Sequence, residues 1–308
     1  MKQYAKESLD LARKTFQQWQ EDKVSRLAAA LAFFAVLSLP SLLTLAITIA
    51  SQVIGARHAR QVVLGEAGTI AGPQVQNALA AILETADRPQ TLTLTALASV
   101  AILFFSASGV LVQLQDALNT IWGVQPDPAQ GIFAVIKQRA FAFLVIIALG
   151  VLLIALLLAN TLVTALGQSL NTFLPFSFGW ARVLTLFVSF VLYTLLIAAL
   201  FKTIPNAQIA WRDVGIGALV TALLLSVGIA GLSLYFEYSD PTSSYGAAGS
   251  LMALLLWVYF SAQILFLGAE FTEIYARRFG SSIRPDDNAV WQPAALTSSV
   301  ATQSDKRR

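Results

Sequence analysis

Long apolar blocks alternate with short polar segments along the chain, and the blocks are long enough to cross a membrane. A helix needs roughly 20 apolar residues to span the apolar core of a bilayer. Six blocks have about this length and are predicted to be membrane-spanning helices: residues 27–54, 91–115, 140–166, 183–201, 214–236 and 246–269. The predicted fold class is therefore all-α, a six-helix membrane bundle over residues 27–275.

Turn-forming residues, rather than charges, separate the third block from the fourth. Residues 140–181 contain no charged side chain, and 42 uncharged residues are too many for a single span. The run is interrupted by Gly167, Asn171, Pro175 and Gly179. Because these residue types favour turns, we place the connection between the two helices there.

The segment before the first block, residues 1–26, has the pattern of an amphipathic helix. Apolar residues, Leu11, Phe16 and Trp19 among them, fall near one helical face, whereas basic residues such as Arg13 fall elsewhere. Such a helix lies on the inner membrane surface, or it is a solvated helix that packs against the bundle. The pattern favours neither interpretation over the other.

Two more segments lie outside the predicted spans. In the long outer loop, residues 55–90, apolar residues recur at helical spacing. These residues are Val75, Leu79, Ile82 and Ala86. We expect this loop to be a connector with one short helix that caps the outer side of the bundle, in preference to a ligand site.

The carboxyl-terminal segment, residues 276–308, is rich in Ser, Thr, Pro and Asp after Gly280 and is predicted to be disordered.

The distribution of charge supports the membrane assignment and gives an orientation. Hydrophobic residues make up 56% of the chain and charged residues 12%, against about 25% charged residues in a typical soluble domain. The two tails and the loops on their side of the bundle hold 16 Lys and Arg residues, and the other side holds 4. Basic loops stay in the cytoplasm, so both termini are predicted to be cytoplasmic, in a multi-pass protein of a bacterial inner membrane. A cleaved signal peptide is not expected, because the first block is too long.

Few residues offer chemistry. The chain has no cysteine and a single histidine, His58. A metal site needs several convergent ligands, and the motifs of zinc peptidases, serine hydrolases and P-loop nucleotidases are missing from the sequence. We therefore expect a protein that is not an enzyme, with no cofactor, no metal site and no nucleic-acid partner.

Glu270 is the most informative polar residue, because it follows the uncharged run of the last block directly. A carboxylate at that depth is costly unless it is paired. In one interpretation it belongs to an ion-linked or proton-linked gate. In the other, which we favour, it is a boundary charge that pairs with a basic residue such as Arg26 or Arg212.

Three other residues within or beside the spans attract attention. Gln263 lies nearer the middle of the last block, where it either lines a polar path or bonds to a neighbouring helix. Asn119, one turn from Asp116, is expected to cap or pair locally at the inner end of the second block. Pro40 is expected to kink the first helix.

These residues sit within a recognisable order of short motifs. The motifs are Ala28-Ala29-Ala30-Leu31-Ala32-Phe33 with Pro40, Leu118-Asn119 with Trp122, Ile204-Pro205-Asn206 with Trp211-Arg212, Tyr245-Gly246-Ala247, Leu256-Trp257-Val258-Tyr259 and Gly268-Ala269-Glu270. From about Asp22 to Tyr275 the chain resembles the YihY/BrkB family of bacterial inner-membrane proteins. Relatives often have two tyrosines where this chain has Phe33 and Phe34.

The resemblance implies a six-helix inner-membrane protein without a defined molecular activity. A ribonuclease label carried by some members has no chemical support in these residues. The candidate structural or gating residues are Pro40, Asn119, Pro205, Arg212, Tyr245, Gly246, Trp257, Gln263 and Glu270.

The leading functional hypothesis is a membrane protein that moves or gates a solute or a lipid, because nearly all of its mass lies in the predicted bilayer region. The expected partners are therefore the lipid bilayer and an unidentified solute or lipid. The alternative is a non-transporting structural or assembly factor of the cell envelope. It is supported by the scarcity of buried charge, since ion-coupled transporters commonly carry intramembrane carboxylates.

Overall fold

The computed structural model describes residues 2–86, 94–127, 140, 144, 180–239, 248–281 and 283–292. Its described helices are α1 (Lys2–Glu21), α2 (Val24–Ile54), α3 (Ala56–Ala71), α4 (Pro73–Ala86), α5 (Leu94–Ile121), α7 (Trp180–Thr203), α8 (Trp211–Ser239) and α9 (Gly249–Phe279). Its described strands are β1 (Val124–Pro126), β2 (Ala207–Gln208), β3 (Arg284–Pro285) and β4 (Ala289–Trp291). The described part of the chain is thus mainly helical, as predicted.

Three of the described helices are long and apolar enough to cross a membrane: Val24–Gln52, Trp211–Phe236 and Gly249–Phe279. A shorter apolar helix covers Phe187–Thr203. These four helices coincide with the predicted spans at 27–54, 214–236, 246–269 and 183–201. The predicted span at 91–115 falls largely within α5, whereas the predicted span at 140–166 and the turn formers after it lie almost entirely outside the described residues.

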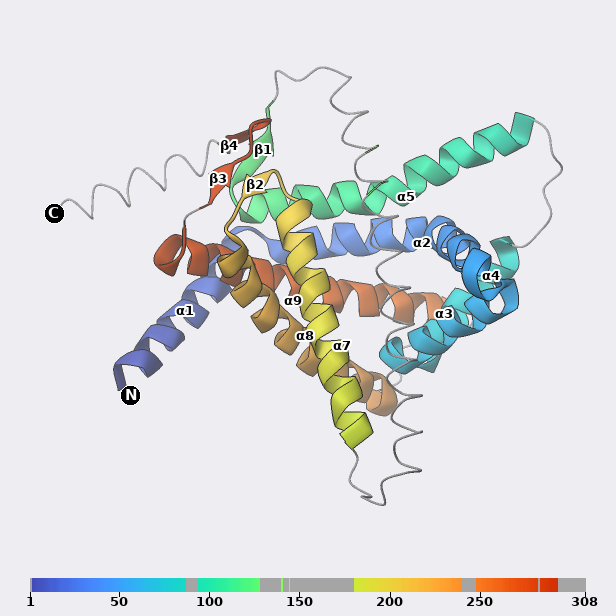
Figure 1. Ribbon diagram of the computed structural model, residues 1–308, viewed down its shortest axis with the longest axis horizontal. Helices are drawn as coiled ribbons and strands as arrows, with labels where there is room; N and C mark the ends of the chain where they lie inside the picture. Colours follow the sequence, from blue (N-terminus) through green and yellow to red (C-terminus); the bar gives the residue numbers. More distant parts are fainter. Residues whose placement is uncertain are drawn as a thin grey trace.

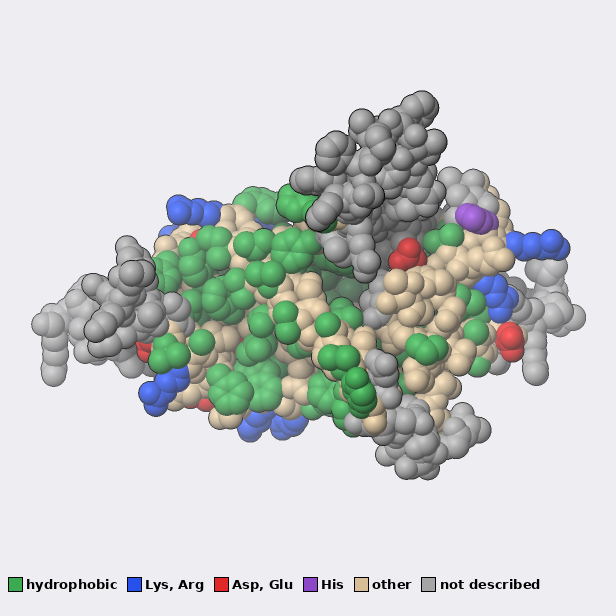
Figure 2. Space-filling view, turned by 90° about the horizontal axis from the view of Figure 1, so that it is seen from below, with side chains coloured by type: hydrophobic (Ala, Val, Ile, Leu, Met, Phe, Trp, Pro, Cys, Tyr) green, Lys and Arg blue, Asp and Glu red, His purple; other side chains and the backbone are tan. Residues whose placement is uncertain are grey.

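Large apolar side chains on the outer surface of these helices are exposed, as expected for a surface that faces lipid. Phe33 and Leu37 on α2, Phe187 on α7 and Val227 on α8 are all more than half exposed. Figure 2 shows hydrophobic side chains gathered over the middle of one face of the molecule, with Lys and Arg side chains toward its edges. Helices that are apolar on every side are typical of membrane spans.

Helix α9 is the central element of the bundle. It contacts α1, α2, α4, α5 and α8, and α8 in turn contacts α7 (Figure 1). The main buried cluster includes Leu118 and Trp122 from α5 and its end, Phe201 from α7 and Phe266 from α9. Residues on α9 therefore determine which faces of the other helices meet.

Two short antiparallel strand pairs join the connecting segments at one end of the bundle, here called the strand end (Figure 1). Strand β1 pairs with β4, with Val124 opposite Trp291, and β2 pairs with β3, with Gln208 opposite Arg284. No strand was expected from the sequence, and the prediction of a disordered tail from residue 276 is wrong for residues 276–279, which end α9, and for residues 283–292. Because each strand has only two or three residues, none has an alternating pattern long enough to recognise.

The strand end gathers the segments that were predicted to lie on one side of the membrane. It holds the connections that follow α5 and α7 and the tail that follows α9. Helix α1 joins them through an ion pair between Arg278 and Asp10, with 2.7 Å between the nitrogen and oxygen atoms. The described segments that carry most of the Lys and Arg residues are therefore close together in space, whereas Arg57 and Arg60 of α3 lie at the other end.

The opposite end carries a helical hairpin, so the expectation of a connector with one short helix at 55–90 is wrong. Gly55 and Gly72 have φ angles of 79° and 87° and separate α2, α3 and α4. Glycine adopts such angles without strain. Val75 and Leu79 of α4, predicted to share a helical face, are buried against residues of α2, α8 and α9. Helix α3 was missed because Arg57, Arg60 and Glu66 interrupt its apolar pattern.

Candidate functional site

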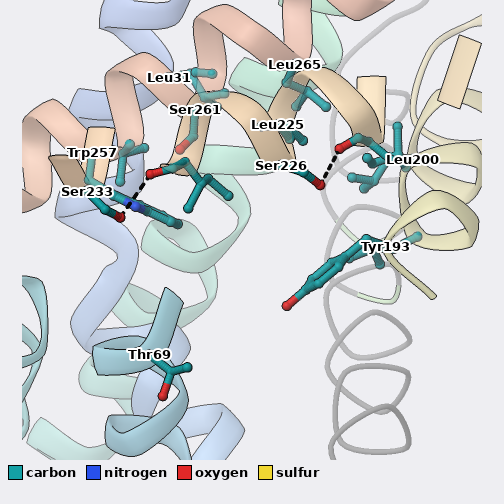
Figure 3. Close-up of a pocket in the computed structure, with 16 residues that line it drawn as sticks. Leu31, Thr69, Tyr193, Leu200, Leu225, Ser226, Ser233, Trp257, Ser261 and Leu265 are labelled. Carbon is teal, nitrogen blue, oxygen red and sulfur yellow. Dashed lines mark hydrogen bonds between the residues drawn. The ribbon is translucent and has the colours of Figure 1, made fainter. Parts of the chain in front are cut away.

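A cavity of about 580 Å³ lies between α7, α8 and α9, with contributions from α2 and α3 (Figure 3). Its described lining residues are Leu31, Thr69, Tyr193, Leu196, Ile197, Leu200, Ala222, Leu225, Ser226, Ile229, Ser233, Trp257, Val258, Ser261, Ala262 and Leu265. Its volume is within the usual range of ligand pockets, about 300–1,000 Å³. None of these lining side chains carries a charge, which disfavours an ionic ligand in this region.

The described lining combines polar and aliphatic side chains toward the hairpin formed by α3 and α4 and is wholly aliphatic toward the strand end. Helix α8 runs away from the strand end and α9 runs back toward it. We therefore divide the cavity into two halves along these helices. The polar half contains every hydroxyl and indole group of the described lining, from Thr69, Tyr193, Ser226, Ser233, Trp257 and Ser261, together with the aliphatic residues Leu196, Ile229 and Val258. The apolar half contains Leu31, Ile197, Leu200, Ala222, Leu225, Ala262 and Leu265.

Two polar atoms of the polar half have no hydrogen-bond partner among the described residues. They are Nε1 of Trp257 and Oγ of Ser261, and both are buried. The hydroxyl groups of Ser226 and Ser233, by contrast, donate to carbonyl oxygens of their own helix at 2.8 and 2.9 Å. Because a buried polar group without a partner costs about 1–3 kcal/mol, Trp257 and Ser261 are the lining residues with most to gain from a ligand.

Glu270 lies beyond the apolar half of the cavity, on the same helix as Trp257. It is 0% exposed, and neither carboxylate oxygen makes a hydrogen bond of good geometry with a described residue, but the carboxyl group of Asp22 is close enough to interact with it. The charged groups that act on it most strongly are the carboxyl groups of Asp22, Glu273 and Glu21. Burial also raises the pKa of Asp22, which precedes α2.

The predicted ion pair of Glu270 with Arg26 or Arg212 is wrong, since both arginine side chains are exposed and neither pairs with it. Position 212 is the second residue of α8, where a long basic side chain can extend out of the bundle. Within α9, Arg277 pairs with Glu273, and its Nε lies 2.6 Å from a carboxylate oxygen of that residue.

A network of amide side chains ties α5 to the connection between α7 and α8. Asn119 and Asn206 exchange two hydrogen bonds: the Asn119 side-chain amide donates to Oδ1 of Asn206 at 2.9 Å, and the Asn206 backbone N–H donates to Oδ1 of Asn119 at 2.8 Å. The Gln115 side chain donates to the Ile204 carbonyl at 2.7 Å, beside the buried Pro205. The prediction that Asn119 pairs locally is therefore wrong.

Asp213 ties the start of α8 to the end of α9, and the sequence analysis did not identify it. Its side chain is almost fully buried, and one carboxylate oxygen accepts from the backbone N–H and the hydroxyl group of Ser281, each at 2.9 Å. A Cβ atom at Gly280 would overlap this carboxylate. The available signal was an acidic residue in the first turn of a predicted helix, but that pattern does not indicate a partner 68 residues away.

Helices α8 and α9 approach each other through a reciprocal pair of glycine–threonine contacts. Gly217 on α8 meets Thr272 on α9, and Gly268 on α9 meets Thr221 on α8. Each threonine hydroxyl donates at 2.7 Å to the carbonyl of the glycine on its own helix. Small residues allow such close approach in membrane bundles.

The remaining predicted residues take varied places. Pro40 lies inside α2, which continues through it, and Trp257 lines the cavity. Gln263 accepts a hydrogen bond from the Ser25 hydroxyl on α2 at 3.4 Å, so it bonds to a neighbouring helix and is not among the described cavity residues. Tyr245 and Gly246 lie outside the described residues.

Nothing in the described residues resembles a metal centre. His58 is exposed at the start of α3. The part of the chain that the structure describes contains no group of three or more His, Cys, Asp or Glu side chains placed to hold a metal ion.

These observations define a helical membrane protein whose bundle has a cavity without a charged side chain among its described lining residues. The family model described as virulence factor BrkB matches residues 15–291, so the chain belongs to that family. No solved structure is significantly similar to it.

Several bacterial relatives are described as UPF0761 membrane proteins. The Azotobacter vinelandii protein is 28% identical over 88% of this chain and 64% of its own length. The Ralstonia nicotianae protein is 25% identical over 84% of this chain and 57% of its own length, and the Pseudoalteromonas atlantica protein is 26% identical over 83% and 82%. The chain thus matches less than two thirds of the length of the first two relatives.

Proposed function

We propose that this protein binds an apolar or amphipathic molecule, such as a lipid, in its cavity and moves or gates it within the membrane. The observation that carries the proposal is the cavity of about 580 Å³ with an uncharged described lining. An ion or a strongly polar solute would lose its hydration there without gaining a charged partner. We further propose that the protein is not an enzyme and needs neither a cofactor nor a nucleic-acid partner. The absence of cysteine and the single, exposed histidine support this view.

The proposed setting is a bacterial inner membrane, with six spans and with the strand end in the cytoplasm. The support is the 16 to 4 distribution of Lys and Arg together with the gathering of the described basic segments at one end. Helix α1 is proposed to lie in the membrane interface. Its Leu9 and Phe16 side chains are 75% and 54% exposed, and only two residues separate it from α2.

Reporter fusions test this orientation. Fusions after Gly65, Leu170 and Pro241 are expected to report the outer compartment, and fusions after Gln130, Gln208 and Ser281 the cytoplasm. The physical reason is that Lys and Arg in short loops resist translocation. Paired alkaline phosphatase and green fluorescent protein fusions provide the measurement. One inverted site would require the neighbouring spans to be redrawn.

Filling the cavity tests the function directly. Ser226→Trp places a large side chain at a lining position, and we expect purified protein in lipid vesicles to lose most of its movement of a fluorescent lipid. The matched control is Val227→Trp on the next residue, which is 73% exposed and does not line the cavity. It should behave as the unmodified protein does.

Melting temperatures of both variants establish that they fold. Full lipid movement by a folded Ser226→Trp variant would contradict the proposal and favour the structural or assembly role. A loss of movement that is equal in the two variants would also contradict it, because the effect would then not depend on the cavity.

A further inference from the structure

The polarity of the cavity changes along its length, and this change can orient a ligand. The apolar half, at the strand end, contains only aliphatic side chains, and every hydroxyl and indole group belongs to the polar half. Figure 3 shows Trp257 and Ser233 on one side of the cavity and Leu200 and Leu265 on the other, with Ser226, at the boundary of the two halves, beside Leu225. Trp257 and Leu265 are eight residues apart on α9, about 12 Å along a helix, so the change extends over a substantial part of a lipid chain.

The unpartnered groups of the polar half indicate which ligand atom belongs there. An indole N–H is only a donor, so the atom complementary to Trp257 is a hydrogen-bond acceptor. Ser261 lies four residues later on the same helix and therefore on the same face, and its hydroxyl group is also without a partner among the described residues. Because the described lining carries no charge, a neutral acceptor suits this position better than a phosphate or a carboxylate.

We infer that the cavity holds one acyl ester lipid in a fixed orientation. Its chain lies in the apolar half and points toward the strand end, and its ester carbonyl accepts hydrogen bonds from Trp257 and Ser261. This inference rests on the proposed function, because it names the class of molecule that the cavity takes. It adds a direction and a neutral acceptor group, which an apolar cavity alone does not require.

Two photoactivatable monoacylglycerols of equal chain length test the orientation. One carries a diazirine at the end of the chain and the other carries it beside the ester. The full-length protein in nanodiscs is irradiated with each, and the labelled residues are identified by mass spectrometry. We expect the first probe to label the apolar half, at Leu200, Leu225 or Leu265, and the second to label the polar half, at Ser233 or Trp257.

The outcomes separate the two proposals. Labelling of the same half by both probes, or labelling in the reverse order, overturns the inference and leaves the proposed function standing. Absence of labelling in the cavity overturns both. A photoactivatable amino acid at position 225 provides a further check. If it crosslinked to residues 140–166 of the same chain, the inference and the proposed function would both be overturned.

Removing the two donors tests the acceptor. The Trp257→Phe, Ser261→Ala double variant should label about two- to tenfold less with the ester-proximal probe, which is the range that one net hydrogen bond supplies. A diazirine-bearing alkane without an ester should label the unmodified protein and the variant equally. Trp211→Phe is the control, because Trp211 is exposed and does not line the cavity. Equal ester labelling in a double variant with an unchanged melting temperature would overturn the role of Trp257 and Ser261.

Discussion

Replacing Gly217 with alanine is expected to lower the melting temperature of the detergent-purified protein, whereas replacing Gly215 with alanine is not. A Cβ atom at position 217 would overlap Thr272 of α9, but one at position 215 would meet no atom within 4 Å. Threonine is stiff about its first side-chain torsion, so α8 and α9 would have to move apart. Overpacking of this kind costs about 1–3 kcal/mol.

Gly215→Ala is a matched control because it lies on the same helix, two residues away. Alanine forms helices better than glycine by roughly 1 kcal/mol in water, so this variant should melt at the same or a higher temperature. Gly217→Ala combined with Thr272→Gly should recover part of the loss, since it removes the overlapping side chain. Equal melting temperatures for the two single alanine variants would contradict the close contact.

Glu270→Gln is expected to leave the melting temperature unchanged or higher, and its effect on movement of the proposed lipid distinguishes a gating residue from a boundary residue. Its carboxyl group is fully buried near the carboxyl groups of Asp22 and Glu273 and has no basic partner among the described residues. Burying an unpaired charge is costly, and glutamine has nearly the same size without that charge. A loss of function without a loss of stability would assign Glu270 to a gate. The measurements are thermal unfolding and lipid movement in vesicles.

Glu273→Gln is the matched control, one turn along the same helix. Glu273 is 4% exposed and pairs with Arg277 at 2.6 Å, so its replacement removes a real partner. Because the Arg277 side chain is 38% exposed, we expect a loss of about 1–3 kcal/mol rather than the larger cost of breaking a fully buried pair. If Glu270→Gln destabilised the protein as much as Glu273→Gln does, Glu270 would have an unrecognised structural partner. Full transport by Glu270→Gln would exclude it from the gate.

Features of the fold that have a local cause could be predicted from the sequence. The apolar run before Glu270 is confirmed as part of helix α9, and the helical spacing of Val75 and Leu79 is confirmed by their burial in α4. The reason is that helical hydrogen bonds join residues four apart. The length of an apolar run likewise indicates by itself whether the segment can span a membrane. The resemblance carried by the motifs from Ala28 to Glu270 likewise identified the family, which the matching model over residues 15–291 shows.

Contacts that join distant parts of the chain could not be predicted from the sequence. Asn119 bonds to Asn206, 87 residues later, and β1 pairs with β4 across more than 160 residues. An amide side chain has the same donors and acceptors whether its partner is one turn away or on another helix. The sequence near the membrane boundary could therefore place Arg212 at the same depth as Glu270, but it could not show that the Arg212 side chain is directed away from Glu270.

By itself, then, the sequence determined that this protein is a helical membrane protein. It also determined the positions of most of the described apolar helices and the scarcity of charged groups within them. Only the tertiary structure decided that Glu270 is buried among acidic residues, that Gly217 and Gly268 lie against threonines, and that described residues of five helices line the cavity. The reason is physical: the hydrophobic effect is not directional, so an apolar helix can pack with any of its faces. The side chains that meet are selected by packing between helices, which depends on every helix at once.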